Sequence, residues 1–228
     1  MTFSFMQNVK YFIILALFVT GTMGIFFFLY AQSRASGNSV KRPSQNTPPF
    51  SVYPAVSQNN LPAKVFSVPI DQAVFRVTKK PFGIKVSRAD SPVQPERFNG
   101  FHTGVDFEIT NDEQNTDVKI YAICSGVLLE KRHASGYGGV AVQKCQLDGN
   151  DITIIYGHLA LVSVAAQAGD SLARGQAIGL LGKAYSVDTD GERKHLHLGI
   201  HRGDAVDIRG YVQNASELNQ WIDVMKYL

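Results

Sequence analysis

Residues 139–165 read GVAVQKCQLDGNDITIIYGHLALVSVA, and this stretch decides the expected fold. It holds short runs of Val, Ile and Leu that are bounded by glycine. Similar runs occur on both sides of it, as VFRVTKKPFGIKV, GVDFEI, KIYAI, GVLLEK, AIGLLG and HLHLGIH. Short β-branched and apolar runs at this spacing, separated by turn residues, are typical of strands. The sequence therefore predicts an all-β domain with a largely antiparallel sheet over residues 65–228.

Only the end of the chain has a helical pattern. Apolar residues recur there at steps of three and four, which places them on one face of a helix. Ser216 precedes them and is a residue type that caps helix N-termini. We therefore expect a short C-terminal helix that packs on the sheet through Leu218, Trp221, Ile222, Met225 and Leu228.

The N-terminal part has a different composition. Residues 11–31 (YFIILALFVTGTMGIFFFLYA) lie within 23 uncharged residues between Lys10 and Arg34. A helix of this length spans the roughly 30 Å hydrocarbon core of a bilayer. We expect a transmembrane anchor here, after a short tail at residues 1–10. The alternative is a cleaved signal peptide, although its apolar region is usually only about 7–15 residues long. Basic residues on both sides leave the orientation open.

Residues 32–64 are rich in Ser, Pro, Asn and Gln and show no helical or alternating periodicity. This composition predicts a flexible linker, which as a coil would span roughly 30 Å. The whole chain has 22 basic and 19 acidic residues, a net charge of +3. Such a small excess, spread along the chain, gives no indication of a nucleic-acid partner.

The two cysteines, Cys124 and Cys145, lie in separate predicted strands, YAICSGVLLEK and GVAVQKCQL. Paired strands can bring them close enough for a disulfide, which requires an oxidising compartment. Two buried free thiols are the alternative. The sequence leaves this choice open.

Four of the six histidines lie in three short patterns, FHTGVDF, YGHL and HLH. Side chains on one face of a strand recur at every second residue, so His102 and Asp106 can point the same way, as can His195 and His197. Convergent imidazole and carboxylate groups suit Zn²⁺. His102, Asp106 and one histidine of the HLH pair would hold the metal and leave one position open for water. The other histidine and His158 would then be free for proton transfer.

In this order the patterns resemble the lysostaphin/LytM-type metallopeptidases, which cut peptidoglycan peptides with one zinc ion. The resemblance covers roughly residues 75–207 and includes KPFG, HTGVDF, GYGGVAV, YGHLALVSV, AGDSLARGQAIGLLG and HLHLGI. It implies a fold of the lysostaphin/LytM-like, duplicated hybrid motif type. It also implies three zinc ligands, which are His102, Asp106 and His197, and two catalytic histidines, which are His158 and His195.

Tyr137 in the GYGG turn matches a tyrosine that some family members place over the site, where its hydroxyl supports the tetrahedral oxyanion. The alternative is an ordinary aromatic residue at a glycine turn. Lys194 stands where the family often has proline, and Leu198 where phenylalanine is common. The loop AYSVDTDGERK before His195 and the long stretch SRADSPVQPERFNG before His102 are expected to border the cleft. These departures affect substrate choice rather than zinc binding.

The expected function is that of a single-pass membrane zinc endopeptidase, with its catalytic domain outside the cytoplasm and a peptidoglycan peptide as substrate. The alternative is an inactive relative that regulates another cell-wall hydrolase through a protein partner. Loss of a ligand would favour that alternative, but all five histidine and aspartate positions hold competent residues. A structural zinc domain is disfavoured, because such sites usually have four ligands and are rich in cysteine.

Overall fold

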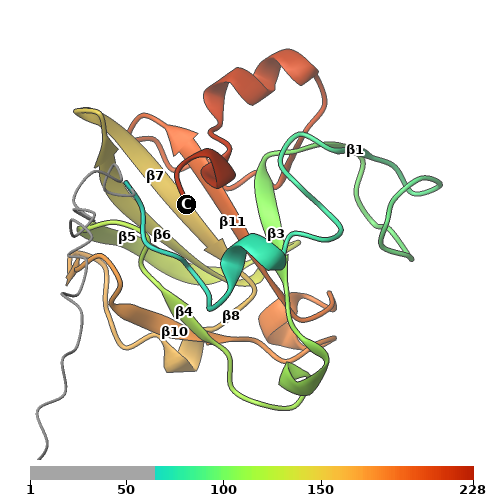
Figure 1. Ribbon diagram of the computed structural model, residues 1–228, viewed down its shortest axis with the longest axis horizontal. Coiled ribbons are helices and arrows are strands. Elements are labelled where there is room, and N and C mark those ends of the chain that lie inside the picture. Colours follow the sequence, from blue (N-terminus) through green and yellow to red (C-terminus); the bar gives the residue numbers. More distant parts are fainter. Residues whose placement is uncertain (1–64) are drawn as a thin grey trace, which may run out of the picture. The chain divides into compact units, whose positions relative to one another are not determined.

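The computed structural model describes residues 65–228. These residues form short strands and 3-10 helices (Figure 1). The strands are β1 (Lys85–Val86), β2 (Gly100–His102), β3 (Gly104–Glu108), β4 (Lys119–Tyr121), β5 (Gly126–Ala134), β6 (Gly138–Leu147), β7 (Asn150–Gly157), β8 (Leu159–Ala160), β9 (Ser171–Leu172), β10 (Ala177–Leu181), β11 (His195–Arg202) and β12 (Tyr211–Val212). The 3-10 helices are η1 (Ala73–Phe75), η2 (Asn111–Glu113), η3 (Leu161–Ser163), η4 (Val187–Thr189), η5 (Ala215–Gln220) and η6 (Val224–Lys226).

The largest sheet has six strands in the order β3-β11-β7-β6-β5-β9, and every neighbouring pair is antiparallel (Figure 1). Its β6–β7 hairpin turns at Asp148 and Gly149, which both have positive φ, as a two-residue Asp-Gly turn requires. Two three-stranded antiparallel sheets, β4-β10-β8 and β1-β2-β12, complete the fold. The predicted all-β, largely antiparallel class is therefore confirmed.

Strand β11 contributes side chains both to the apolar core and to the candidate metal site. Its residues Leu196, Leu198 and Ile200 are buried in the main apolar cluster, together with side chains of β3, β4, β7 and β10. Because side chains alternate along a strand, His195 and His197 face the other side of the sheet. The period-two pattern of this strand thus separates core residues from candidate site residues.

Cys124 and Cys145 form a disulfide. Cys145 lies on β6 and Cys124 lies two residues before β5, which pairs with β6 in the sheet. The strand pairing therefore decides the choice that the sequence left open.

The prediction of one continuous C-terminal helix was wrong. The segment forms two 3-10 helices, η5 and η6, separated by residues 221–223, of which Trp221 is extended. Trp221 makes a β-bridge with His201, and its ring packs against the imidazole at 5.0 Å between centroids. Asn214, rather than Ser216, caps η5 through a capping box with Glu217. The tertiary bridge to β11 overrides the local helical periodicity.

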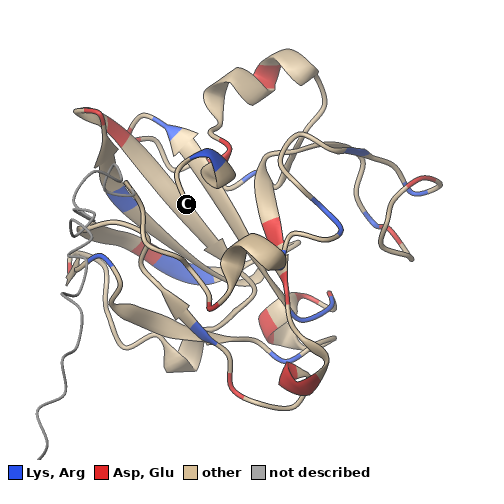
Figure 2. Ribbon diagram, viewed as in Figure 1, with Lys and Arg blue, Asp and Glu red and all other residues tan. Residues whose placement is uncertain are grey.

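Lys and Arg residues are interspersed with Asp and Glu along the described chain (Figure 2). Some of them tie loops to the sheet. The buried Arg76 guanidinium donates to both carboxylate oxygens of Glu113, at 2.5 and 2.9 Å, and to the Glu108 carbonyl at 3.1 Å. The hydrogen bonds from Arg76 lower the pKa of Glu113 to about 2. This contact fixes η2 beside the end of β3.

The predicted tail (residues 1–10), anchor (11–31) and linker (32–64) lie outside the described residues. Within residues 65–228, the structure has no helix that is long and apolar enough to cross a membrane.

Candidate metal centre

The HTGVD motif spans two strands rather than one. His102 ends β2, and Asp106 lies in β3 of a different sheet. The break falls at Thr103, whose N–H donates to the Gly210 carbonyl at 3.0 Å and whose hydroxyl donates to the Arg209 carbonyl at 2.6 Å. The motif therefore brings the two side chains together by a change of sheet, and not by period-two alternation along one strand.

Strand pairing places His197 beside them. In the β3–β11 ladder His197 lies directly opposite Asp106. Gly104 has no Cβ, which lets the His197 ring occupy the space above it; a Cβ there would lie 2.7 Å from the ring. The motif glycine is thus required by the close approach of the imidazole.

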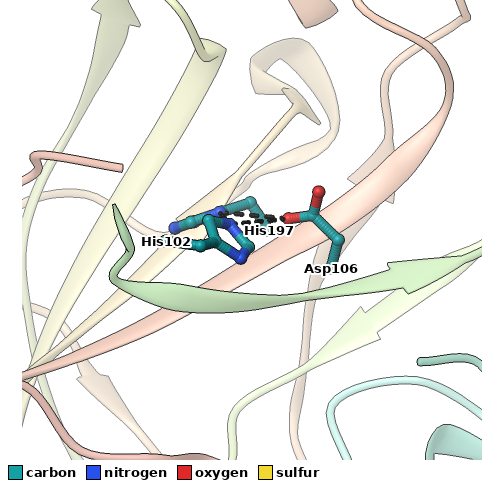
Figure 3. A group of neighbouring side chains, drawn as sticks. All are labelled: His102, Asp106 and His197. Atoms are coloured by element: carbon teal, nitrogen blue, oxygen red, sulfur yellow. Dashed lines mark hydrogen bonds and ion pairs between the residues drawn. The ribbon is translucent and has the colours of Figure 1, made fainter. Parts of the chain in front are cut away.

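The three side chains meet at one point (Figure 3). The distances are 3.0 Å from His102 Nε2 to His197 Nδ1, 3.3 Å from His102 Nε2 to Asp106 Oδ1, and 3.2 Å from His197 Nδ1 to Asp106 Oδ1. A tetrahedral zinc with bonds of 2.0–2.1 Å has ligand–ligand edges of about 3.3 Å. The triangle has the size of one face of that tetrahedron, so these residues fit a zinc ion.

The protonation states of the three side chains also suit metal binding. His102 Nδ1 lies 3.3 Å from the Pro81 carbonyl, which can only accept, so Nδ1 carries the hydrogen and Nε2 presents its lone pair. Burial lowers the pKa of His197 to about 4, only partly offset by its hydrogen bond to Asp106. Burial alone would raise the pKa of Asp106, but the neighbouring His195 and His102 bring it well below its usual value. At neutral pH this leaves an Asp106 carboxylate and a neutral His197, the forms in which both could bind a metal ion.

Two further histidines lie beside the triangle, with ring centroids 4.2 Å apart. His195 donates from Nδ1 to the Arg193 carbonyl at 2.9 Å, which leaves Nε2 as its basic nitrogen, 3.3 Å from Asp106 Oδ2.

His158 follows β7 with φ of 63°, a strained conformation for a residue other than glycine, and such strain concentrates at functional sites. Among the described residues its buried Nδ1 has no hydrogen-bond partner. Burial, and next the nearby His195, hold the pKa of His158 well below its usual value.

Tyr137 is buried against this group. Its ring lies 5.2 Å from that of His197 and 5.7 Å from that of His158. It fits only because residue 157 is glycine, since a Cβ there would lie 2.4 Å from the tyrosine ring. Burial, with the nearby Asp106, raises the pKa of Tyr137, so its hydroxyl keeps its proton.

The centre opens into a cavity of about 400 Å³. As expected, both unusual segments line it, through Phe98 and Asn99 from one and through Glu192 and Arg193 from the other. A third part of the wall, residues 208–213, was not foreseen, because nothing in its local sequence marks a site. Sequence reasoning therefore located the cluster of side chains that could hold a metal, but only part of the cleft.

Arg193 was also missed as a site residue. Its guanidinium donates to Asp106 Oδ2 at 2.8 Å and to the Glu108 carboxylate at 2.5–3.1 Å. The contact to Oδ2 fixes the Asp106 carboxylate within the triangle. Its neighbour Lys194 is buried and donates to the carbonyls of Glu113 and Thr116 at 2.9 and 2.6 Å. Thus Arg193 contacts the candidate ligand Asp106, whereas Lys194 ties the η2 loop to the start of β11.

Residues 100–208 match the model of peptidase family M23. No curated protein sequence matches the chain. Among solved structures, the catalytic domain of lysostaphin from Staphylococcus simulans is similar, with 23% identity, TM-score 0.41, and coverage of 65% of this chain and 86% of that one. LytU gives 16% identity, TM-score 0.43, and coverage of 75% and 88%. A chain of the SpoIIIAH–SpoIIQ complex gives 18% identity, TM-score 0.48, and coverage of 72% and 99%. The match of residues 100–208 to the family model, together with the motifs, supports a peptidase family M23 domain of the lysostaphin/LytM type in this part of the chain.

Proposed function

We propose that this protein is a membrane-anchored zinc endopeptidase that hydrolyses peptide bonds in the cross-links or stem peptides of peptidoglycan. The observation that carries the proposal is the triangle of His102, Asp106 and His197 beside two further histidines at a cavity. Three ligands leave a fourth position, as in catalytic rather than structural zinc sites.

In this proposal His102, Asp106 and His197 bind zinc, which when present acts as a Lewis acid and lowers the pKa of a bound water. His195 accepts the proton that the attacking water loses. It does so at Nε2, because its Nδ1 hydrogen is already donated to the Arg193 carbonyl. His158, which burial keeps neutral, lies against the His195 ring and can stabilise the developing charge. Tyr137 stays protonated at the cavity wall and is available as a hydrogen-bond donor.

The substrate class rests on the lysostaphin/LytM-type resemblance and on the match of residues 100–208 to the model of peptidase family M23. The location outside the cytoplasm is supported by the Cys124–Cys145 disulfide, because such bonds persist in oxidising compartments. Anchoring through residues 11–31 rests on the length and composition of that segment.

The test is digestion of peptidoglycan sacculi by the purified full chain. The zinc-loaded protein should release muropeptides with new amino termini, seen by mass spectrometry, and a chelator should abolish the release. The His195→Ala variant is the matched control, because it keeps the three ligands. If zinc-loaded wild-type protein binds sacculi and cleaves no bond, the protein is instead a regulatory module.

A further inference from the structure

A buried ion pair lies at one wall of the cleft, which Lys80 itself lines. Lys80 Nζ is 2.6 Å from Glu96 Oε2, and both side chains are at most 3% exposed. The Glu96 carboxylate is fixed in turn by the N–H groups of Arg97 and Phe98 and by the hydroxyl of Ser91, at 2.7–3.0 Å. The ammonium group therefore has a fixed position beside the metal centre.

The same ammonium group donates to the hydroxyl oxygen of Tyr211 at 2.9 Å. Lysine is only a donor, so the tyrosine oxygen must accept, and the tyrosine proton must point elsewhere. Among residues 65–228, the structure shows no acceptor for that proton. Tyr211 lines the cavity.

The Tyr211 ring has little freedom to turn away. It stacks on Phe98 with ring centroids 5.2 Å apart and an interplanar angle of 14°. Its other neighbour is the ligand His102, at 5.1 Å between centroids. Its backbone pairs with His102 in the β2–β12 ladder. A hydroxyl held in this way is pre-oriented for a bound group beside the metal ligands.

We propose that Tyr211 donates a hydrogen bond to a carbonyl oxygen of the bound peptide, and that Lys80 and Glu96 are positioning residues that direct its proton into the cleft. Peptide carbonyls are acceptors without a proton of their own, which matches a site that offers only a donor. The inference rests on the proposed endopeptidase function.

The decisive variant is Tyr211→Phe, which keeps the ring stacking and removes only the hydroxyl. Two readouts are made on the full chain: the rate of cleavage of sacculi by zinc-loaded protein, and the sedimentation of metal-free protein with sacculi. We expect unchanged zinc content and at least a tenfold loss in rate or in affinity. Tyr121→Phe, on β4 outside the cavity lining, is the matched control and should behave as wild type.

The positioning role is tested with Lys80→Met in two backgrounds. If Lys80 acts through the hydroxyl, the substitution lowers the rate in wild type but causes no further loss in Tyr211→Phe. A merely structural role would give the same loss in both. If Lys80→Met does not fold, Tyr211→Phe decides the role of the hydroxyl, and Glu96→Gln in the same two backgrounds decides the positioning role.

The outcomes separate the two hypotheses. If wild-type protein cleaves and Tyr211→Phe matches it in both rate and affinity, the role of Tyr211 is refuted while the endopeptidase function stands. If wild-type protein does not cleave, the proposed function fails, and the binding readout still decides whether Tyr211 contacts the peptide.

Discussion

The substitution Gly104→Ala tests how the HTGVD motif builds the metal centre. The added Cβ would lie 2.7 Å from Cε1 and Nε2 of His197 and 2.6 Å from the carbonyl oxygen of Leu198. Real Cβ atoms keep more than 3.0 Å from such neighbours, so the ring and the β11 backbone must both shift. His197 lies 3.2 Å from Asp106 and 3.0 Å from His102, and any such shift opens the ligand triangle.

The expected magnitude follows from overpacking in a rigid interior. Forcing one extra methyl group into a well-packed site costs about 1–3 kcal/mol. For a domain of this size each kcal/mol lowers the melting temperature by about 2–4 °C, so metal-free Gly104→Ala should melt roughly 2–12 °C below wild type. Zinc affinity should fall at least about tenfold, since 1.4 kcal/mol of ligand displacement corresponds to that factor.

The assay is thermal unfolding of metal-free protein beside zinc titration against a chromophoric chelator. Gly199→Ala is the matched control, because Gly199 lies directly opposite Gly104 in the β3–β11 ladder. A Cβ at Gly199 meets its nearest neighbours at 3.4–3.6 Å, which is ordinary contact. If Gly104→Ala kept the melting temperature and zinc affinity of wild type, the explanation of the motif glycine would be wrong.

Three further predictions concern the histidines, the disulfide and pH. His197→Ala should purify with little zinc, whereas His195→Ala and His158→Ala should keep about one zinc per chain and lose roughly 10²–10⁴-fold in turnover; metal analysis beside a cleavage assay decides this. Reduction of the Cys124–Cys145 bond, which joins residues 21 apart, should lower the unfolding free energy by about 3 kcal/mol, measured by urea unfolding with and without reductant. Metal-free protein should keep its stability above pH 6.5 and lose it as the pH falls towards 4. The reason is that burial lowers the pKa of His197 from 6.5 to about 4, so between these values the unfolded chain binds a proton at His197 and the folded protein does not. A melting temperature that is constant from pH 7 to pH 4.5 would contradict this.

The fold class followed from local patterns in the sequence. Glycine-bounded runs of β-branched residues predict strands, since strand propensity and turn chemistry act over a few residues. The spacing of His195 and His197 predicted a shared strand face for the same reason. The ligand set was implied by the resemblance, and the structure brings His102, Asp106 and His197 together.

The rest depended on contacts between distant residues. The helical periodicity around Trp221 was real, but a bridge to β11 replaced the helix with an extended residue. His102 and Asp106 looked like one strand, yet hydrogen bonds from Thr103 to residues 209 and 210 divide them between two sheets.

The sequence by itself determined the strands and the class of fold, because both depend on neighbouring residues, and its short motifs gave the candidate ligands through the family that they resemble. Tertiary structure alone decided the disulfide, the ion pair between Arg193 and Asp106, and the hydrogen bond from Lys80 to Tyr211. Arg193 is 87 residues from Asp106, and Lys80 is 131 residues from Tyr211. Periodicity and local propensity carry no information on such pairs, since only the packing of the sheets brings them within hydrogen-bonding distance.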